Sequence, residues 1–149
     1  MKHGFFRTAA AVVAAVFLCA GSVGAAEFQG RISAKSAILV DADSGRVLFE
    51  KNADERSLIA STTKIMTALV VLEHCALGES VEILPEYTAV EGSSMYLRAG
   101  ETYTVEELLY GMMLVSGNDA ALALACHTAG SVQAFADMMN DKARALGMT

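Results

Sequence analysis

Apolar and polar positions follow two different periods beyond residue 36, which predicts a chain that mixes strands with helices. Residues 36–41 and 46–50 are short runs rich in large apolar residues, and the polar segment Ala42-Asp-Ser-Gly45 separates them. Such runs on either side of a glycine-containing turn predict a β-hairpin. A further short strand is expected at residues 81–84, directly before Pro85.

Longer stretches repeat their apolar residues at helical spacing. Residues 65–72 are apolar nearly all round, which predicts a buried helix that has ended by Gly78. Thr104 and Glu107 have the spacing of a capping box, so a helix is expected to begin there. Its apolar positions are Val105, Leu108, Leu109, Met112 and Met113. Residues 120–125 predict a second helix that is buried on all sides.

The last predicted helix lies between two glycines. Gly130 stops the helix before it, Ser131 is expected to cap its first turn, and Gly147 closes it. One face is expected to consist of Val132, Phe135, Met138, Met139 and Leu146. Residues 86–103 show no clear period, apart from a turn at residues 98–101.

The first 26 residues have the composition of a secretory signal peptide. Lys2, His3 and Arg7 give a positive start, and Ala9 to Ala20 is an apolar run of 12 residues. Small residues follow from Gly21, so we expect cleavage after Ala25 or Ala26. The run is short for a membrane span, which needs about 20 residues, so an uncleaved anchor is the less favoured alternative. The mature chain is therefore expected to work outside the cytoplasm, in the periplasm or cell envelope.

Composition and charge narrow the class of protein. The 149 residues are 54% apolar and 19% charged, which excludes a disordered chain and suits one domain at most. The net charge is −6 and basic residues form no run. Because phosphate neutralisation needs clustered Lys and Arg, we expect no nucleic-acid partner.

Ser61 and Lys64 are the first candidates for chemistry. They lie three residues apart, a spacing that puts two side chains on one face of a helix. A serine hydroxyl is a weak nucleophile until a base takes its proton, and a lysine amine can be that base where burial disfavours its charged form. Free backbone amides at a helix start can also bind a developing oxyanion. Taken alone, the pair is better interpreted as a polar first turn.

Ser116-Gly117-Asn118 is the second candidate, 55 residues after Ser61 and between two predicted helices. Ser116 is placed to relay a proton, and Asn118 to hold a substrate amide. The alternative is an ordinary turn that ends one helix, with Asn118 or Asp119 as the N-cap of the next.

Both motifs together resemble those of the penicillin-recognising serine enzymes. Ser61-Thr-Thr-Lys64 is similar to their Ser-x-x-Lys motif, and Ser116-Gly-Asn118 to their Ser-x-Asn motif. More narrowly, the chain resembles the D-alanyl-D-alanine carboxypeptidases, which are low-molecular-weight penicillin-binding proteins. The similar stretches, which lie within residues 36–149, are the hairpin from Asp41 to Leu48, Ala60 to Leu69, Glu91 to Leu97, and Ser116 to Ala121 with the helices beyond.

The resemblance implies a fold and a reaction. The fold is the β-lactamase/transpeptidase-like α/β (α+β) fold, in which an antiparallel sheet packs against a helical subdomain. The reaction is acyl transfer from a peptidoglycan stem peptide ending in D-Ala-D-Ala, with Ser61 as nucleophile and Lys64 as base. Ser116 would pass a proton to the leaving D-alanine and Asn118 would hold the substrate. β-Lactams are expected to acylate the same serine, and no cofactor is expected.

One family motif does not occur among the 149 residues. The family carries Lys-Thr-Gly on a strand that binds the substrate carboxylate. We interpret residues 27–149 as the N-terminal portion of the catalytic domain, which stops before that motif and before the closing strands. Peripheral membrane association is expected only through a C-terminal segment that these residues lack. A serine β-lactamase of the same fold, or a non-catalytic binding protein, are the alternatives; the glycine at 117 favours the carboxypeptidase over class A β-lactamases.

Metal sites and disulfides were weighed separately. Asp41-x-Asp43-x-Gly45 has calcium-loop spacing but lacks further acidic ligands, so a plain turn is favoured. His74-Cys75 and Cys126-His127 suggest zinc, but adjacent side chains on a helix point in different directions. We therefore expect no metal, and two free thiols in preference to a disulfide.

Overall fold

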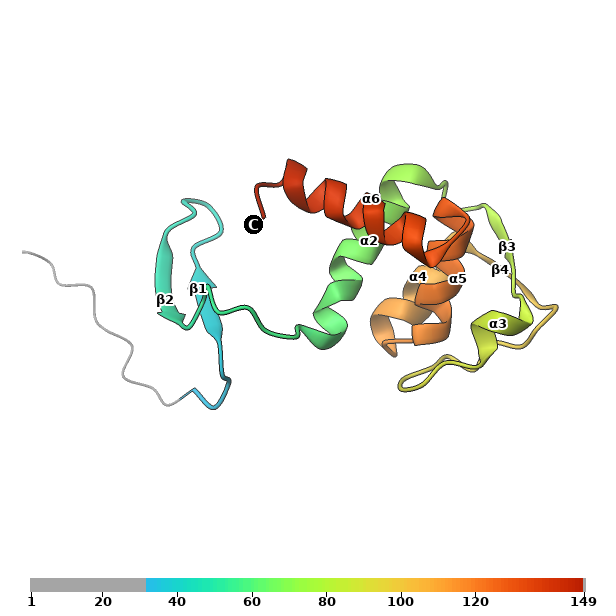
Figure 1. Ribbon diagram of the computed structural model, residues 1–149, viewed down its shortest axis with the longest axis horizontal. Coiled ribbons are helices and arrows are strands. Elements are labelled where there is room, and N and C mark those ends of the chain that lie inside the picture. The colour runs from blue at the N-terminus through green and yellow to red at the C-terminus, as the bar shows by residue number, and fades with distance from the viewer. Residues whose placement is uncertain (1–31, 149) are drawn as a thin grey trace, which may run out of the picture. The chain divides into compact units, whose positions relative to one another are not determined.

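The computed structural model describes residues 32–148, so the predicted signal peptide lies outside the described residues. The chain divides into two compact units, one ending at Ser57 and one beginning at Leu58 (Figure 1). The first contains a hairpin and the second contains the helices. The predicted mixed α/β class is confirmed.

The hairpin of the first unit consists of β1 (Ala37–Val40) and β2 (Val47–Lys51), which pair antiparallel. Its turn closes with two backbone hydrogen bonds, from Asp41 N to Arg46 O and from Gly45 N to Asp41 O, both 2.9 Å. Gly45 has φ of +69°, a conformation that glycine adopts without a steric penalty. The Asp41 carboxylate accepts hydrogen bonds from the hydroxyl and the backbone amide of Ser44. These bonds lower the pKa of Asp41. The Asp41 carboxylate therefore stabilises the turn, as aspartate commonly does at such positions.

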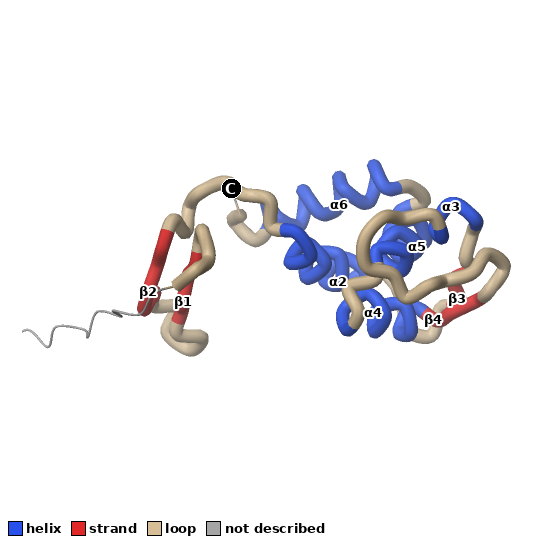
Figure 2. Tube along the Cα trace, turned by 90° about the horizontal axis from the view of Figure 1, so that it is seen from below, coloured by secondary structure: helices blue, strands red, loops and turns tan. Residues whose placement is uncertain are grey.

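The second unit begins with a 3-10 turn, η1 (Ala60–Thr62), which leads directly into helix α2 (Thr63–His74). Strand β3 (Ser80–Glu82) pairs antiparallel with β4 (Thr102–Thr104), and α3 (Pro85–Thr88) begins the connection between them. Three helices complete the unit: α4 (Val105–Leu114), α5 (Asn118–Ala129) and α6 (Val132–Ala145). Figures 1 and 2 both place α3 and the β3–β4 ladder at one end of this helical unit.

Helix α5 is the centre of the core. It packs against α2, α3, α4 and α6, and its Ala120, Ala123 and Leu124 are completely buried. The predicted helix at residues 120–125 is therefore confirmed, but it is not buried on all sides, since Ala121 and Leu122 are only partly buried. Small alanine side chains let the neighbouring helices approach closely, so the residue preceding this helix and its first residues are held firmly in place.

Helix α2 is less buried than its composition predicted. Its buried residues are Lys64, Thr67, Val70 and Val71, whereas Ile65 is 64% and Leu72 is 54% exposed. The expectation of a helix buried on all sides was therefore wrong here. An apolar residue on a helix is buried only where a neighbouring element covers its face. In this unit α2 is contacted by α4, α5 and α6.

Local signals at the helix ends were more reliable. The Thr104 side chain accepts from Glu107 N, and the Glu107 carboxylate accepts from Thr104 N, which confirms the capping box. Gly130 ends α5 with φ of +77°, and the Ser131 hydroxyl accepts from Ala134 N. On α6 Phe135 is buried, but the expected apolar face does not extend to the helix ends. Val132 and Leu146 are both exposed.

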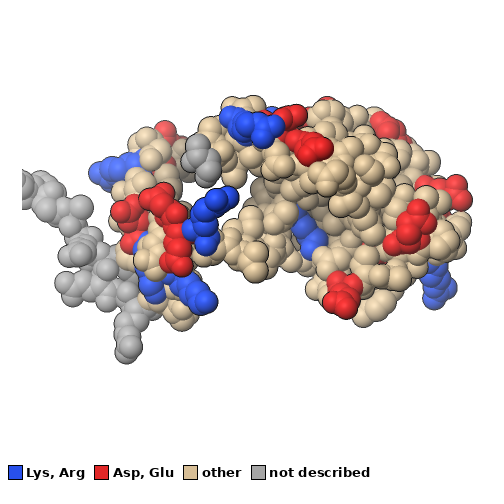
Figure 3. Space-filling view, viewed as in Figure 1, with Lys and Arg blue, Asp and Glu red and all other residues tan. Residues whose placement is uncertain are grey.

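Surface charge and membrane spans add two observations. Acidic side chains are spread over several elements on the face of the helical unit drawn in Figure 3. Among residues 32–148, no helix combines the length and apolar character that crossing a bilayer requires.

Candidate active site

Ser61 and Lys64 are held by the junction of η1 and α2. Ser61 lies in the 3-10 turn and Lys64 in the first turn of the helix. Ala60, directly before Ser61, has a positive φ of 46°. Lys64 is only 9% exposed, so most of its long side chain is enclosed by the unit.

Ser116 and Asn118 are held by the sharp connection between α4 and α5. Ser116 has φ of +59°, a left-handed conformation that is unfavourable for a residue with a side chain. Gly117 is the N-cap of α5 and Asn118 is its first residue. Our alternative, with Asn118 or Asp119 as the N-cap, was therefore wrong by one or two positions.

A chain of hydrogen bonds joins all four predicted residues. Lys64 Nζ donates to Asn118 Oδ1 at 2.6 Å and to Ser116 Oγ at 3.3 Å. The Ser116 hydroxyl donates to Ser61 Oγ at 2.8 Å. Residues that are 52 to 55 positions apart thus meet in one cluster. The hydrogen bonds connect Lys64 through Ser116 to Ser61, which gives a continuous path for a proton between the amine and the Ser61 hydroxyl once the two hydroxyls turn.

A cavity of about 390 Å³ opens beside this cluster. Ser61, Lys64 and Asn118 all line it. The other lining residues are Ala60, Thr63, Thr67 and Ala121. A second cavity, of about 420 Å³, is lined by residues of α2 and α4 and by Leu77, and its lining is apolar except for Glu106 and Tyr110. Of these two cavities, the first adjoins the cluster of Ser61, Lys64 and Asn118.

The Asn118 amide is fixed from two sides. Its Nδ2 donates to Glu91 O at 2.7 Å, and its backbone N donates to Ser93 O at 2.7 Å. Because Oδ1 accepts from Lys64, the side chain is oriented before any ligand arrives. The segment from Glu91 to Leu97, one of the stretches that carried the resemblance, thus forms a wall of the site.

Asp119 is a supporting residue that the sequence interpretation did not identify. Its carboxylate is fully buried and accepts four hydrogen bonds. The donors are Ser94 Oγ at 2.5 Å, Met95 N at 3.0 Å, Leu97 N at 3.1 Å and Ala120 N at 2.9 Å. It ties the segment from Ser94 to Leu97 to the start of α5. Burial raises the pKa of Asp119, but the hydrogen bonds outweigh burial and hold the pKa below its usual range.

The glycine between Ser116 and Asn118 is required by space. A Cβ at Gly117 would lie 2.9 Å from Asp119 Oδ1 and 3.3 Å from both Gly111 O and Met95 N. The backbone of α4, the Met95 segment and α5 therefore meet at this position. A side chain here would displace at least one of the groups that hold the site.

The sequence is similar to a known protein family. A family described as D-alanyl-D-alanine carboxypeptidase matches residues 23–149. The chain belongs to this family. It is 42% identical over 120 residues to the D-alanyl-D-alanine carboxypeptidase DacF of Bacillus subtilis, covering 77% of this chain and 31% of DacF. It is 39% identical over 158 residues to DacC of Escherichia coli, covering 96% of this chain and 39% of DacC.

Solved structures are similar in the same way. The D-alanyl-D-alanine carboxypeptidase DacD of Francisella tularensis has a TM-score of 0.77 and 38% identity, over 83% of this chain and 31% of that one. A point mutant of the Streptomyces K15 DD-transpeptidase has a TM-score of 0.76 and 39% identity, over 81% of this chain and 52% of that one. The chain spans about a third of the length of its curated relatives DacF and DacC.

Proposed function

We propose that the protein is a serine-type D-Ala-D-Ala carboxypeptidase, which removes the terminal D-alanine from peptidoglycan stem peptides. The observation that supports this most strongly is the hydrogen-bonded series Lys64, Ser116 and Ser61 beside a cavity. Membership of the carboxypeptidase family supplies the substrate class. No cofactor takes part in the proposed reaction.

The first half of the cycle forms an acyl-enzyme. Ser61 Oγ attacks the carbonyl carbon between the two D-alanines, and its proton passes through Ser116 to the amine of Lys64, which acts as the base. The backbone amide of Ser61 is a candidate donor to the oxyanion. When the C–N bond breaks, Ser116 returns a proton to the leaving D-alanine. The acyl group then remains as an ester on Ser61.

The second half releases the peptide. Water attacks the ester carbonyl, Lys64 accepts the water proton through the same hydroxyl, and Ser61 regains its own proton. Asn118 has one amide N–H left after its bond to Glu91 O, and this N–H is proposed to hold the substrate backbone. β-Lactams are proposed to acylate Ser61 and to leave slowly.

Location follows from the N-terminal pattern. We propose that residues 1–26 are removed during export and that residues 27–149 belong to an extracytoplasmic catalytic domain. The positive start and the apolar run from Ala9 to Ala20 support this. N-terminal sequencing of the exported protein should begin at Ala26 or Glu27, whereas a chain that retains Met1 would contradict cleavage.

The nucleophile is tested in the full-length protein. A penicillin adduct should be found on the peptide that contains Ser61, together with D-alanine release from a D-Ala-D-Ala peptide. Ser61→Ala should abolish both, while Ser80→Ala, a control at an exposed serine on β3, should leave both unchanged. An adduct that persists in Ser61→Ala would refute the assignment.

The same assays separate the alternatives. Penicillin hydrolysis that is faster than D-alanine release would identify a β-lactamase. The absence of any adduct in the unmodified full-length protein would identify a non-catalytic binding protein. Transfer of the acyl group to an added amine in place of water would identify a transpeptidase.

A further inference from the structure

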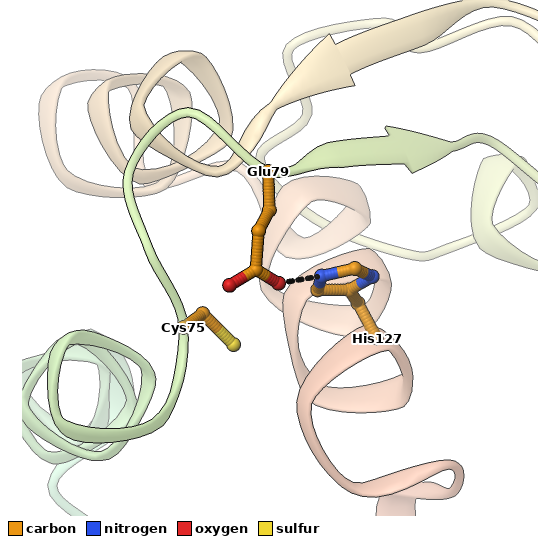
Figure 4. Close-up of side chains that lie close together, drawn as sticks. All are labelled: Cys75, Glu79 and His127. Atoms are coloured by element: carbon orange, nitrogen blue, oxygen red, sulfur yellow. Dashed lines mark hydrogen bonds and ion pairs between the residues drawn. The ribbon is translucent and has the colours of Figure 1, made fainter.

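Three metal-ligating side chains meet at a second place in the helical unit. Cys75 directly follows α2, Glu79 directly precedes β3, and His127 lies in the last turn of α5. Their ligand atoms all lie within 4.8 Å of one another, and Figure 4 shows the three side chains pointing into one space. We propose that Cys75 Sγ, Glu79 Oε2 and His127 Nε2 bind one zinc ion, with water as the fourth ligand. This proposal is independent of the carboxypeptidase function.

The donor set selects the metal. A thiolate favours zinc or copper(I) over calcium and magnesium, and an imidazole is a good zinc ligand. Zinc sites with three protein ligands and an open fourth position are tetrahedral. A carboxylate as the third ligand adds a negative charge, so that thiolate and carboxylate together balance the charge of Zn²⁺.

The distances are close to those of a bound site. His127 Nε2 already lies 3.0 Å from Glu79 Oε2, joined by a hydrogen bond. In a tetrahedral zinc site, ligand atoms are separated by about 3.3–3.7 Å, as follows from metal–ligand bonds of about 2.0–2.3 Å. Zinc would thus take the place of the hydrogen bond between His127 and Glu79. Cys75 Sγ lies within 4.8 Å of the other two ligand atoms, so it would need to approach them by about 1 Å.

Neighbouring groups already orient two of the three ligands. Glu79 Oε1 accepts from Ala76 N at 2.6 Å, which leaves Oε2 directed toward His127. The Thr128 hydroxyl lies 3.3 Å from Cys75 Sγ and donates its one proton to Leu124 O at 2.8 Å. It therefore accepts from the Cys75 thiol and holds Sγ in place until zinc displaces the thiol proton. The bond from Ala76 N is of the kind that fixes a ligating carboxylate in metal sites.

Access and sequence context are consistent with such a site. The His127 side chain is 26% exposed and that of Glu79 is 44% exposed, so an ion can reach both from solvent.

The sequence did not predict this cluster, because His74-Cys75 and Cys126-His127 were considered as adjacent pairs. The fold instead joins one member of each pair across more than 50 residues and adds Glu79. His74 and Cys126 take no part in this cluster.

Zinc at this place would connect the end of α2 with the end of α5. This connection would stabilise the helical unit without contacting Ser61 or Lys64. A ligand that binds only the folded state stabilises it by RT ln(1 + L/Kd), where L is the free ligand concentration, so the stabilisation grows with the logarithm of the free zinc concentration above Kd. Zinc is therefore expected to raise the Tm of the chelator-stripped protein.

The test is a titration of the purified, reduced full chain with Zn²⁺ against a chromophoric chelator. We expect one equivalent to bind. Cys75→Ala and His127→Asn should each weaken binding by more than about 100-fold, because even outer-shell changes cost about 10–100-fold. The matched controls His74→Asn and Cys126→Ala should stay within about threefold of the unmodified chain, since neither residue belongs to the cluster.

Cobalt gives a second measurement, and its main result comes from the unmodified chain. Co²⁺ bound to the unmodified chain should show a thiolate-to-metal charge-transfer band, which Cys126→Ala retains and Glu79→Gln weakens. Failure of the unmodified chain to bind one zinc equivalent, or absence of the thiolate band, would overturn the proposal. So would equal losses of affinity in the cluster variants and in the His74→Asn and Cys126→Ala controls.

Discussion

Asp119→Asn is the substitution that tests how the active-site wall is held. The carboxylate accepts from Met95 N and Ala120 N through Oδ1, and from Ser94 Oγ and Leu97 N through Oδ2. An amide group has the same shape but only one acceptor atom. If the amide nitrogen replaces Oδ2, the Leu97 N–H faces another donor instead of an acceptor.

The structure gives the magnitude. Leaving one buried N–H without an acceptor costs about 1–3 kcal/mol, and hydrogen bonds to a charged group contribute about 1.5–3 kcal/mol each. The Ser94 hydroxyl can turn and accept from the new amide, so one bond is recovered. We therefore expect Asp119→Asn to lower the free energy of unfolding by about 3 kcal/mol.

The site should lose activity as well. Glu91 O and Ser93 O hold Asn118, and the segment that Asp119 anchors begins directly after Ser93. Because a displacement of about 1 Å can cost about 100-fold in rate, acylation of Ser61 by penicillin should slow by about that factor.

The assay is urea unfolding followed by circular dichroism, with Asp137→Asn as control. Asp137 is an exposed aspartate on α6, and the control should change stability by less than about 0.5 kcal/mol. Loss of less than about 1 kcal/mol in Asp119→Asn would refute the hydrogen-bond accounting.

The pH dependence has a definite sign. The pKa of Asp119 is lowered in the folded state, whereas an unfolded aspartate titrates near about 3.9. The stabilisation is therefore fully present above about pH 4–5 and is lost as the pH falls through the lower, folded pKa. The difference in stability between the unmodified chain and Asp119→Asn should shrink over that acidic range. A difference that stays constant down to the acid limit would contradict the low pKa of Asp119.

Three further predictions follow from the same contacts. Lys64→Arg in the full-length protein should abolish acylation almost as fully as Lys64→Ala, because arginine keeps the charge but does not give up its proton. The control Lys142→Arg should remain active. Acylation of the Lys64→Arg variant would show that the lysine acts only through its charge. Gly117→Ala should destabilise by about 1–3 kcal/mol through its contact with Asp119, whereas Gly78→Ala, whose Cβ would meet nothing within 4 Å, should not; equal stability of the two would disprove the packing argument. Cys75 and Cys126 form no disulfide in the structure, so the intact mass without reductant should equal the reduced mass. A value two hydrogens lower would reveal a disulfide.

Structural features that depend on residues close in the sequence were predictable. The capping box at Thr104 and Glu107 and the stop at Gly130 depend on contacts within one helical turn. Ser61 and Lys64 are linked in the same way, because their spacing along a helix start decides their common face. The resemblance to the carboxypeptidases, confirmed by the family match, added the pairing of Ser116 and Asn118 with them.

Contacts between distant residues were not predictable. Asp119 suggested only a helix cap, since nothing local indicates that four donors from residues 94–120 converge on its carboxylate. The exposure of Ile65 depends on which elements cover α2, and the helix period alone does not contain that information. The meeting of Cys75 with His127 likewise depends on how α2 and α5 pack.

Left-handed backbone at residues with side chains has a consequence for any effort to engineer this protein. Ala60 directly precedes the proposed nucleophile, Ser116 is the proposed relay, and Tyr96 belongs to the wall segment; all three have positive φ. Each such residue costs about 1–3 kcal/mol relative to a relaxed conformation. Screens for thermostability should therefore enrich glycine at these positions, because glycine removes the penalty. The selected chains should withstand heat better and acylate more slowly, which would make thermal tolerance and catalytic rate opposing traits in this family member.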